Sequence, residues 1–262
     1  MERLTRAEKR LVKQQKRQEV KQNKNNLELK CIVPKTANQE QVFKDFTNGK
    51  NLLIHGLPGT GKSFISLYLA LNEIQNYNEY RSVVIIRSVV PSRDMGFLPG
   101  NIKEKSRAYE APYQSICNEL YGRGDAYEIL KSKGLVQFET SSFLRGVTLN
   151  DSIIIVDECQ NMTYHELCTI ITRLGKNSRV IFCGDYMQTD LKYDDEREGL
   201  IHFMRILHTM RKHFNTIEMQ IEDIVRSGIV KEFIIRKHDY ESPKVVIVKN
   251  AKFDIKQEKV FH

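Results

Sequence analysis

The chain has 262 residues, of which 40% are hydrophobic and 28% charged, as in a soluble globular protein of one good-sized domain with extensions or two small domains. Its net charge is +8, no apolar run approaches the about 20 residues of a membrane span, and the basic N-terminus lacks the apolar core of a signal peptide. Five scattered cysteines without a C-x-x-C pair indicate buried free thiols in a cytoplasmic protein, with neither zinc nor disulfides, and we expect no membrane partner.

Residues 1–30 hold most of the positive charge. They contain ten Lys or Arg against four Glu, a net +6, while the rest of the chain contributes only +2. Their apolar residues are sparse and form no stripe, so this tail buries too little surface to fold firmly alone. One interpretation is a solvated, partly helical tail; the other is an arm that neutralises nucleic-acid phosphates.

Residues 34–46 open the folded domain with a helix. Thr36 and Gln39 have the spacing of a capping box, with Thr36 as the N-cap and Gln39 at the third helical position. Gln39 thus has a structural explanation of its own, and a ligand role for it needs separate support.

Residues 56–63 fill the pattern G-x-x-x-x-G-K-[ST] of a phosphate-binding P-loop. An apolar run at 52–54 precedes it, and apolar residues at helical spacing follow it, which is the strand–loop–helix context the pattern needs. The alternative is a glycine turn that resembles the pattern by accident. The predicted nucleotide-binding residues of this loop are Gly56, Pro58, Gly59, Thr60, Gly61, Lys62 and Ser63.

The chemistry expected of the P-loop follows from its residue types. The glycines let backbone N–H groups point at a phosphate chain, and the helix that begins near Lys62 adds the positive end of its dipole. Lys62 would lie on the β- and γ-phosphates, and the Ser63 hydroxyl would bind Mg²⁺.

Residues 82–86, rich in Val and Ile, predict a second buried parallel strand. The next segment, 87–100, has two prolines and two glycines and predicts a long connection of the kind that is usually functional or mobile. Residues 103–133 predict a charged helical insertion. It carries four tyrosines, a set that is more often core than a stacking surface: Tyr109, Tyr113, Tyr121 and Tyr127.

The remaining pattern alternates strands and helices. Strands are expected at 135–139, 152–156 and 179–183, with a helix at 163–174 capped by Gly175. Amphipathic helices are expected at 199–214 and 222–235, the second interrupted by Gly228, and a short strand pair at 243–248 and 253–255. This alternation predicts an α/β fold with three layers around a central parallel sheet.

Asp157 and Glu158 end the apolar strand at 153–156 in the form of a Walker B motif. Asp157 would hold Mg²⁺ beside Ser63, directly or through water. Glu158 would orient or deprotonate the attacking water, although two acids after a strand can also be an ordinary loop start.

Gln188 ends the segment Gly184-Asp185-Tyr-Met-Gln188, which follows the next strand. An amide both donates and accepts hydrogen bonds, so Gln188 is a candidate to sense the γ-phosphate and the water. This role requires the strand at 179–183 to lie between the P-loop strand and the Walker B strand.

The chain closely resembles the PhoH-like family of P-loop ATPases, which is related to superfamily 1 helicases. The resemblance covers about residues 34–236, and the segment 87–104 looks most like members carried by bacteriophages. It rests on eight motifs: Thr36-Ala-Asn38-Gln39, Gly56–Ser63, Met95-Gly-Phe-Leu-Pro-Gly100, Leu144-Arg145-Gly146, Asp157-Glu158-Cys159-Gln160-Asn161, Thr172-Arg173-Leu-Gly175, Gly184-Asp185-Tyr-Met-Gln188 and Asp223-Ile-Val-Arg226-Ser227. Cys159 replaces a more usual Ala, and Ala108-Tyr109 stands where a Pro-Tyr pair is common.

The resemblance implies one RecA-like core that binds and hydrolyses ATP with Mg²⁺, with Gln39 on the adenine. It also implies a link to RNA or single-stranded DNA and a ring-like homo-oligomer, such as a hexamer. The expected domains are a basic tail over 1–30, the ATPase over 31–236 and a short extension over 237–262.

Three functions remain open. The first is an oligomeric ATPase that translocates on or unwinds RNA or single-stranded DNA; the second is an ATP-dependent adaptor that recruits a nuclease or other partner. The third, a small-molecule kinase, is disfavoured because no acceptor pocket or lid is identifiable.

Two groups of residues are candidates for completing the site. A superfamily 1 helicase closes its site with arginines of a second core, so we expect a neighbouring subunit to supply Arg226 or Arg173 here. Each has another explanation: Arg173 at the end of its own helix, Arg226 in a pair with Asp223 or Glu222. Candidates for nucleic acid are Arg93 and Lys103 on phosphates and Phe97 on a base, although Phe97 packing inward is an equal alternative.

Overall fold

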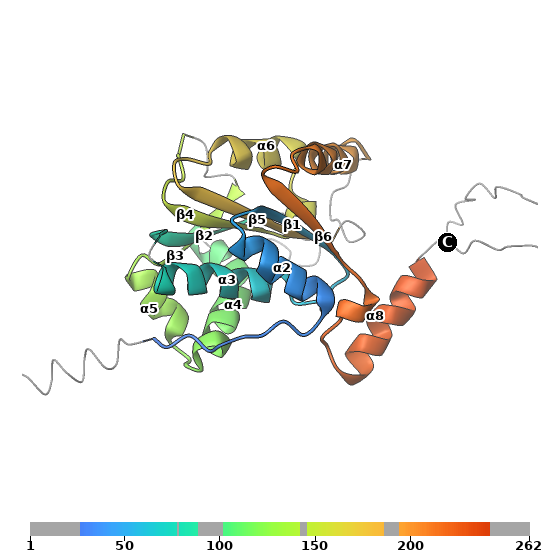
Figure 1. Cartoon of the computed structure of the whole chain (residues 1–262), viewed down its shortest axis with the longest axis horizontal. Coiled ribbons are helices and arrows are strands. Elements are labelled where there is room, and N and C mark those ends of the chain that lie inside the picture. The colour runs from blue at the N-terminus through green and yellow to red at the C-terminus, as the bar shows by residue number, and fades with distance from the viewer. Residues whose placement is uncertain (1–26, 78, 89–101, 142–145, 186–193, 242–262) are drawn as a thin grey trace, which may run out of the picture. The chain divides into compact units, whose positions relative to one another are not determined.

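The structure is a computed structural model that describes residues 27–241, except 78, 89–101, 142–145 and 186–193, and it omits the side chains of 102–106, 194–197 and 241. Its centre is a six-stranded sheet in the order β3-β2-β4-β5-β1-β6 (Figure 1). Every strand pairing is parallel. The strands are β1 (Asn51–Gly56), β2 (Ser82–Arg87), β3 (Val136–Thr140), β4 (Ser152–Asp157), β5 (Ser178–Gly184) and β6 (Phe214–Met219).

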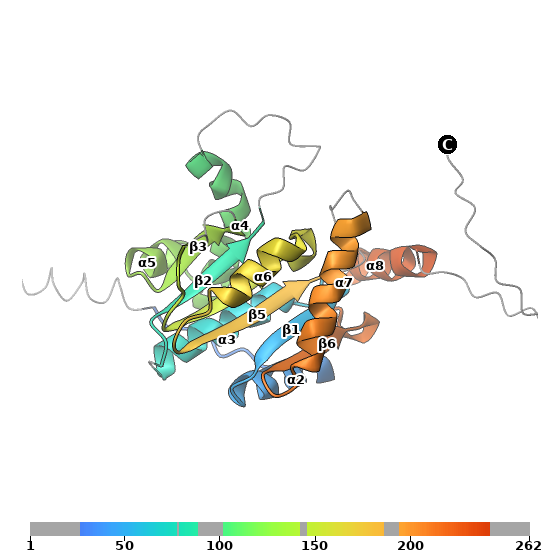
Figure 2. The ribbon, with the colours of Figure 1, turned by 90° about the horizontal axis from the view of Figure 1, so that it is seen from above.

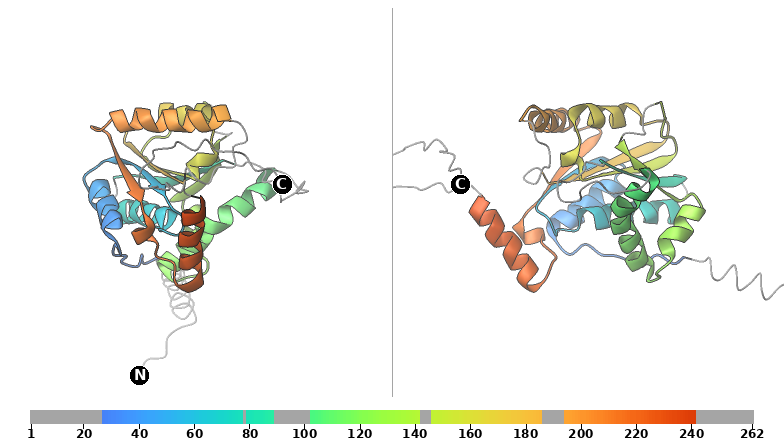
Figure 3. Two further views of the ribbon diagram at one scale, coloured as in Figure 1. Left: turned by 90° about the vertical axis from the view of Figure 1, so that its right-hand side faces the viewer. Right: turned by 180° about the vertical axis from the view of Figure 1, so that it is seen from behind.

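Helices cover both faces of the sheet, which confirms the predicted three-layer α/β architecture. Seen from above, α6 and α7 lie across one face, and the views from the side and from behind show α2 to α5 on the opposite face (Figures 2 and 3). The first pair is α6 (Tyr164–Thr172) and α7 (Asp194–Thr209). The opposite layer consists of α2 (Ala37–Thr47), α3 (Lys62–Asn76), α4 (Ile102–Tyr121) and α5 (Ala126–Ser132).

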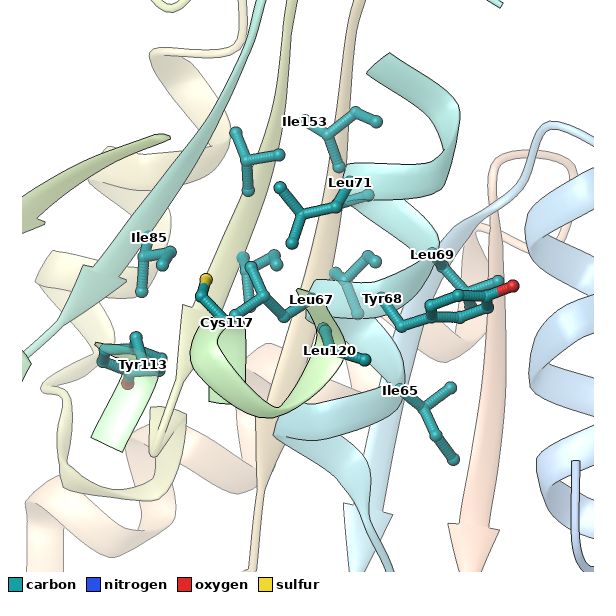
Figure 4. Close-up of a cluster of buried hydrophobic side chains, with 14 of the residues drawn as sticks. Ile65, Leu67, Tyr68, Leu69, Leu71, Ile85, Tyr113, Cys117, Leu120 and Ile153 are labelled. Atoms are coloured by element: carbon teal, nitrogen blue, oxygen red, sulfur yellow. The ribbon is translucent and has the colours of Figure 1, made fainter. Parts of the chain in front are cut away.

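The larger of the two hydrophobic cores lies between the sheet and α2 to α5. Helix α3 contributes buried residues from most of its length, and α4 packs beside it with Tyr113, Cys117 and Leu120 (Figure 4). Of the four tyrosines in the insertion, Tyr113, Tyr121 and Tyr127 are buried, which confirms that they are mainly core. Most of this core is aliphatic, and the buried tyrosines add to the apolar surface that it removes from water.

The second core lies under α6 and α7. Neighbouring residues of one strand alternate between the two cores: Ile153 and Ile155 face the first, Ile154 and Val156 the second. A strand buried on both faces needs an unbroken apolar run, which explains why β4 was recognisable in the sequence.

The sequence prediction was wrong about β6. The helix expected over 199–214 occupies 194–209, and the chain then forms a strand that pairs with β1 at the sheet edge. Exposed and buried residues alternate from Thr216 to Met219, as in an edge strand, while Phe214 is buried in the core on the other face. Its mixed polar sequence carries a weaker strand signal than the fully apolar central strands.

Two further helix boundaries differ from the prediction. Helix α6 ends at Thr172 with Arg173 as its C-cap, so Gly175 is not the cap. Gly175 is instead required by a close approach, because a Cβ there would lie 2.1 Å from the Asn150 Oδ1 atom. The predicted helix at 222–235 is a 3₁₀ turn, η4 (Ile221–Asp223), followed by a separate helix, α8 (Gly228–Glu241).

The ends of the chain add three observations. Leu27 and Leu29 pack against the larger core, so part of the predicted tail belongs to the folded domain. A second unit begins at Arg226 and contains α8, and the predicted strand pair at 243–248 and 253–255 lies outside the described residues. No helix among the described residues is long and apolar enough to cross a membrane.

All five cysteines are free. Cys117, Cys159 and Cys183 are buried as expected, but Cys168 is half-buried and Cys31 is exposed. The expectation of buried thiols therefore holds for three of the five.

Candidate functional site

The candidate site lies at the carboxyl ends of three adjacent strands. Strand β5 pairs with β1 on one side and with β4 on the other, so it separates the P-loop strand from the strand that ends in Asp157. This is the strand order that the proposed role of Gln188 required. Gln188 itself lies outside the described residues.

The P-loop between β1 and α3 depends on glycine at its first position. Gly56 has a φ of 116°, and a Cβ there would lie only 2.2 Å from the carbonyl oxygen of Met219. The loop is therefore packed directly against the end of β6, and Gly61 has a left-handed conformation at the N-cap of α3. The backbone shape expected from the pattern is present.

Two distant segments hold the P-loop in place. At the end of β6, the Met219 carbonyl accepts from Leu57 N at 3.2 Å, and six residues later Val225 N donates to the Gly59 carbonyl at 3.0 Å. Before α2, the Gln39 Nε2 donates to the Thr60 carbonyl at 3.0 Å. The loop is thus bonded on two sides by backbone and amide groups.

Gln39 is buried and its side chain is already engaged at both ends. Its Oε1 accepts from Lys35 N at 2.8 Å while its Nε2 bonds to the P-loop. Thr36 caps the helix as predicted, accepting from Gln39 N, but the reciprocal half of the predicted capping box is replaced by the bond to Lys35. Gln39 is placed beside the P-loop, where a role on the adenine stays a prediction.

Asp223 joins the two bracing segments. It is 2% exposed, and its carboxylate accepts hydrogen bonds from Thr36 Oγ1, from Asn38 Nδ2 at 2.7 Å and from Gln220 N at 2.8 Å. A buried carboxylate needs such donors to offset its lost hydration. Two motifs that are far apart in the sequence, at 36–39 and 223–227, therefore meet through Asp223.

Lys62 lies at the start of α3, inside the loop. Its Nζ donates to the carbonyls of Gly56 at 2.7 Å and Leu57 at 2.8 Å. Burial lowers the pKa of Lys62, and the nearby carboxylates, Asp185 foremost, act against that lowering. The ammonium is therefore a cation set among acids at the mouth of the loop.

Ser63 and Asp157 come together from opposite sides of β5. The Ser63 hydroxyl donates to Asp157 Oδ1 at 2.8 Å, and Asp157 is 5% exposed. Burial, and next the neighbouring Glu158, raise the pKa of Asp157. Because Mg²⁺ prefers oxygen ligands, an adjacent hydroxyl and carboxylate in a site that disfavours bare negative charge fit this ion.

Glu158 follows with a backbone that is unusual for a residue with a side chain. It has a φ of 52° and a ψ of 41°, in the left-handed region, which costs roughly 1 kcal/mol. Its Oε2 accepts from Gln160 Nε2 at 2.5 Å, and Gln160 Oε1 accepts from Asp185 N at 3.0 Å. Gln160 thus connects the Walker B acids to the segment that leads toward Gln188.

His55 is the last side chain before the P-loop. Burial, and next the positive charge of Lys62, lower its pKa to about 4. In register it lies opposite Gly184 on β5 and Glu218 on β6. His55 is therefore neutral at pH 7.

The candidate arginines lie in different parts of the molecule. The Arg173 carbonyl accepts a hydrogen bond from Leu149 N at 2.9 Å. Leu149 lies three residues before β4 begins, so Arg173 is near the amino ends of the strands, whereas the P-loop of the same chain lies at their carboxyl ends. Its Nε is buried without a hydrogen-bond partner among the described residues. Arg226 is the first residue of the second unit, and a partner proposed for it, Asp223, is engaged as described above.

The proposed nucleic-acid contacts fall largely outside the description. Arg93 and Phe97 are not among the described residues, nor is the side chain of Lys103. Arg87, at the end of β2, is described: it lies in register with Asp157, and its guanidinium carbon is 5.7 Å from the ring centre of Tyr109.

Sequence reasoning did not identify three residues that shape the site. Gln160 stood inside a recognised motif without a role, Asp223 was considered only as a partner of Arg226, and Tyr113 was one of four tyrosines assigned to the core. The Tyr113 hydroxyl donates to Asp157 Oδ2 at 2.8 Å. No spacing rule links residues 113 and 157, so only the fold reveals this contact.

Comparison with known proteins gives relatives over most of the chain. A PhoH-like protein of Mycobacterium leprae is 33% identical over 219 residues, which are 81% of this chain and 60% of that protein. Protein PhoH2 of Bacillus subtilis is 35% identical over 152 residues, 56% of this chain and 34% of that protein. The chain thus spans about 60% of the length of the mycobacterial relative.

Solved structures give weaker likenesses. The large terminase of a thermophilic bacteriophage matches with a TM-score of 0.46 and 9% identity, over 79% of this chain and 50% of that chain. The UvsW helicase of bacteriophage T4 matches with a TM-score of 0.41 and 17% identity, over 78% of this chain and 67% of that chain. The model of one family, described as PhoH-like protein, matches residues 31–237. This chain therefore belongs to the PhoH-like family.

Proposed function

We propose that this protein is a Mg²⁺-dependent ATPase that acts on RNA or single-stranded DNA as an oligomer, in the cytoplasm. The observation that carries the proposal is the 2.8 Å contact between Ser63 of the P-loop and Asp157 of β4. A hydroxyl and a carboxylate meet beside Lys62, with Glu158 next in the chain, and this is the set of groups that phosphoryl transfer requires.

Each group has a distinct task in this proposal. The P-loop backbone from Gly56 to Gly61 receives the phosphates, whose oxygens compete with the Gly56 and Leu57 carbonyls for the Lys62 ammonium. Ser63 and Asp157 would hold Mg²⁺, which would supply positive charge to the phosphate oxygens. Glu158 takes the proton of the attacking water, Gln188 orients that water, and Gln39 contacts the adenine.

Nucleic acid is the proposed second substrate because the protein carries a net charge of +8 and the motifs of its phosphate site resemble those of superfamily 1 helicases. The proposed path of the nucleic acid crosses the carboxyl end of β2, at Arg87. The segment that contains Arg93 and Phe97 follows Arg87 in the chain. Open α/β sheets bind ligands at this edge.

The test of the proposal is ATP turnover by the purified chain with Mg²⁺, with and without single-stranded RNA or DNA, with particle mass measured alongside. We expect turnover that rises with nucleic acid and an assembly larger than one chain. Turnover that no nucleic acid changes would favour an ATP-dependent adaptor, and absence of turnover would overturn the proposal.

The oligomer matters because one lysine and Mg²⁺ compensate the transition-state charge incompletely. An arginine from a neighbouring subunit can add about 10³–10⁵ in rate, and we propose Arg226 for this role, with Arg173 second. Mixing inactive Lys62→Ala subunits with inactive Arg226→Ala subunits should restore part of the turnover, because some interfaces then join an intact P-loop to an intact arginine. No recovery in proven mixed assemblies would exclude Arg226.

A further inference from the structure

The carboxylate of Asp157 is shared between two hydroxyl groups from different layers of the fold. Ser63 donates to Oδ1 and Tyr113 donates to Oδ2, each at 2.8 Å. Tyr113 is 1% exposed and comes from α4, the first helix of the insertion after β2. The proposed function assigns it no task.

The ring of Tyr113 is held firmly, so the direction of its hydroxyl is fixed. It lies in the larger core near Cys117 and Leu120 (Figure 4), with the centre of the Phe138 ring 5.8 Å from its own. Packing of this density leaves a buried aromatic side chain one rotamer. The hydrogen bond to Asp157 is therefore built into the core rather than made by a mobile surface group.

This hydrogen bond fixes the orientation of the Asp157 carboxylate. The Ser63 hydroxyl donates to Oδ1 and the Tyr113 hydroxyl donates to Oδ2, so each oxygen is held by a donor from a different helix. The donor on Oδ2 prevents rotation of the carboxylate. Groups that orient a metal ligand in this way typically change metal affinity about 10–100-fold when they are removed.

We propose that Tyr113 is a positioning residue that fixes the Asp157 carboxylate for Mg²⁺ binding and so makes helix α4 part of the metal site. This inference rests on the proposed function, in which Asp157 holds Mg²⁺. It goes beyond it, because it ties the insertion between β2 and β3 to the phosphate site through one hydroxyl.

The test compares two single-atom changes on one helix. Tyr113→Phe removes the hydroxyl that Asp157 accepts, and Tyr121→Phe removes a buried hydroxyl that has no hydrogen-bond partner among the described residues. Binding of a fluorescent ATP analogue to the full chain is measured in EDTA and then during a Mg²⁺ titration. We expect Tyr113→Phe to need about 10-fold more Mg²⁺ for half of the gain in affinity, with unchanged affinity in EDTA.

The outcomes separate this inference from the proposed function. If the unmodified chain gains no affinity from Mg²⁺, the proposed metal site and the role of Tyr113 both fail. If it gains affinity and Tyr113→Phe needs the same Mg²⁺ as Tyr121→Phe, only the role of Tyr113 fails. A lower Mg²⁺ requirement in Tyr113→Phe would also overturn it, because the hydroxyl would then be holding Asp157 away from the ion.

Discussion

The two sides of the phosphate site are held by different kinds of bond. On the P-loop side, Leu57 and Gly59 bond through their backbone to Met219 and Val225, and Gln39 adds an amide. The shape of this side depends on close backbone contact, which leaves no room for a Cβ at Gly56.

On the acidic side, the two carboxylates are held by hydrogen bonds from single side chains. Asp157 depends on the hydroxyls of Tyr113 and Ser63, and Glu158 on the amide of Gln160. Backbone contacts spread the effect of a change over the fold, whereas a side-chain contact confines it. We therefore expect changes on the P-loop side to lower stability and nucleotide binding together, and changes on the acidic side to lower activity or Mg²⁺ affinity with little loss of stability.

Glu158→Gln should give the largest effect, and the effect should be confined to ATP turnover. It removes the proposed base but keeps a carbonyl oxygen that can accept from Gln160, so ATP turnover should fall about 10²–10⁴-fold. Nucleotide affinity and the thermal midpoint should stay close to those of the unmodified chain. Turnover and calorimetry on the same preparation check this.

The control for this change is Glu119→Gln, at an exposed position on α4, which should leave turnover intact. Normal turnover in Glu158→Gln would show that another group activates the water.

Gly56→Ala should break the P-loop side as a whole. The added Cβ meets the Met219 carbonyl and the φ of 116° is strained for alanine, so we expect a loss of about 3 kcal/mol in unfolding free energy. Nucleotide affinity should fall with it. Denaturant unfolding and nucleotide binding measure both effects.

Gly134→Ala separates strain from contact. Gly134 also has a positive φ, 70°, but nothing lies within 4 Å of a Cβ there. Its loss should be about 1 kcal/mol, and its nucleotide affinity should be unchanged. Equal losses in the two variants would mean that the Met219 contact relaxes easily.

The difference between the two sides also explains which parts of the site could be predicted from the sequence. The P-loop and the Walker B acids are local patterns that follow apolar strands, so residues 56–63, Asp157 and the central parallel sheet were predictable. Edge strand β6 was missed because its alternation is short and mixed with polar residues. Without β6 there was no reason to expect that Met219 and Val225 brace the P-loop.

Contacts between residues that are far apart in the sequence were the other feature that could not be predicted. Tyr113 reaches Asp157, and Asp223 reaches Thr36, only because layers of the fold meet. A motif such as Asp157-Glu-Cys-Gln160 marks where chemistry gathers, but the partner of each side chain depends on tertiary geometry.

Asp223→Asn tests whether the P-loop side also depends on a single side chain. An amide cannot accept on its nitrogen, so at least one of the three donors at this buried carboxylate loses its partner. We expect a loss of about 2 kcal/mol in unfolding free energy and weaker nucleotide binding, because Gln39 follows directly after Asn38. Asp125→Asn, at an exposed residue paired with Arg123, is the matched control and should leave stability nearly unchanged, because solvent screens an exposed ion pair. A stable Asp223→Asn protein with weakened binding would mean that Asp223 serves the ligand rather than the fold.

Lowering the pH should change the free energy of unfolding differently through the two sides, and this is the smallest effect that we expect. His55, on the P-loop side, has a pKa of about 4 in the folded chain against an ordinary value of 6.5, so between these values the unfolded state binds more protons. Stability from His55 is therefore complete above about pH 6.5 and is lost as the pH falls toward 4. Asp157, on the acidic side, has a raised pKa and acts in the opposite direction.

We expect the loss from His55 at pH 5 to be roughly 1–2 kcal/mol, since the side chain is only partly buried. The measurement is denaturant unfolding at pH 7 and pH 5 for the unmodified chain and for His55→Gln, with His165→Gln, at an exposed helix position, as the control. His55→Gln should lose less stability between the two pH values than either of the others, because it has no proton to take up on unfolding. An equal loss in all three proteins would mean that His55 titrates normally and that Lys62 and the surrounding burial do not govern it.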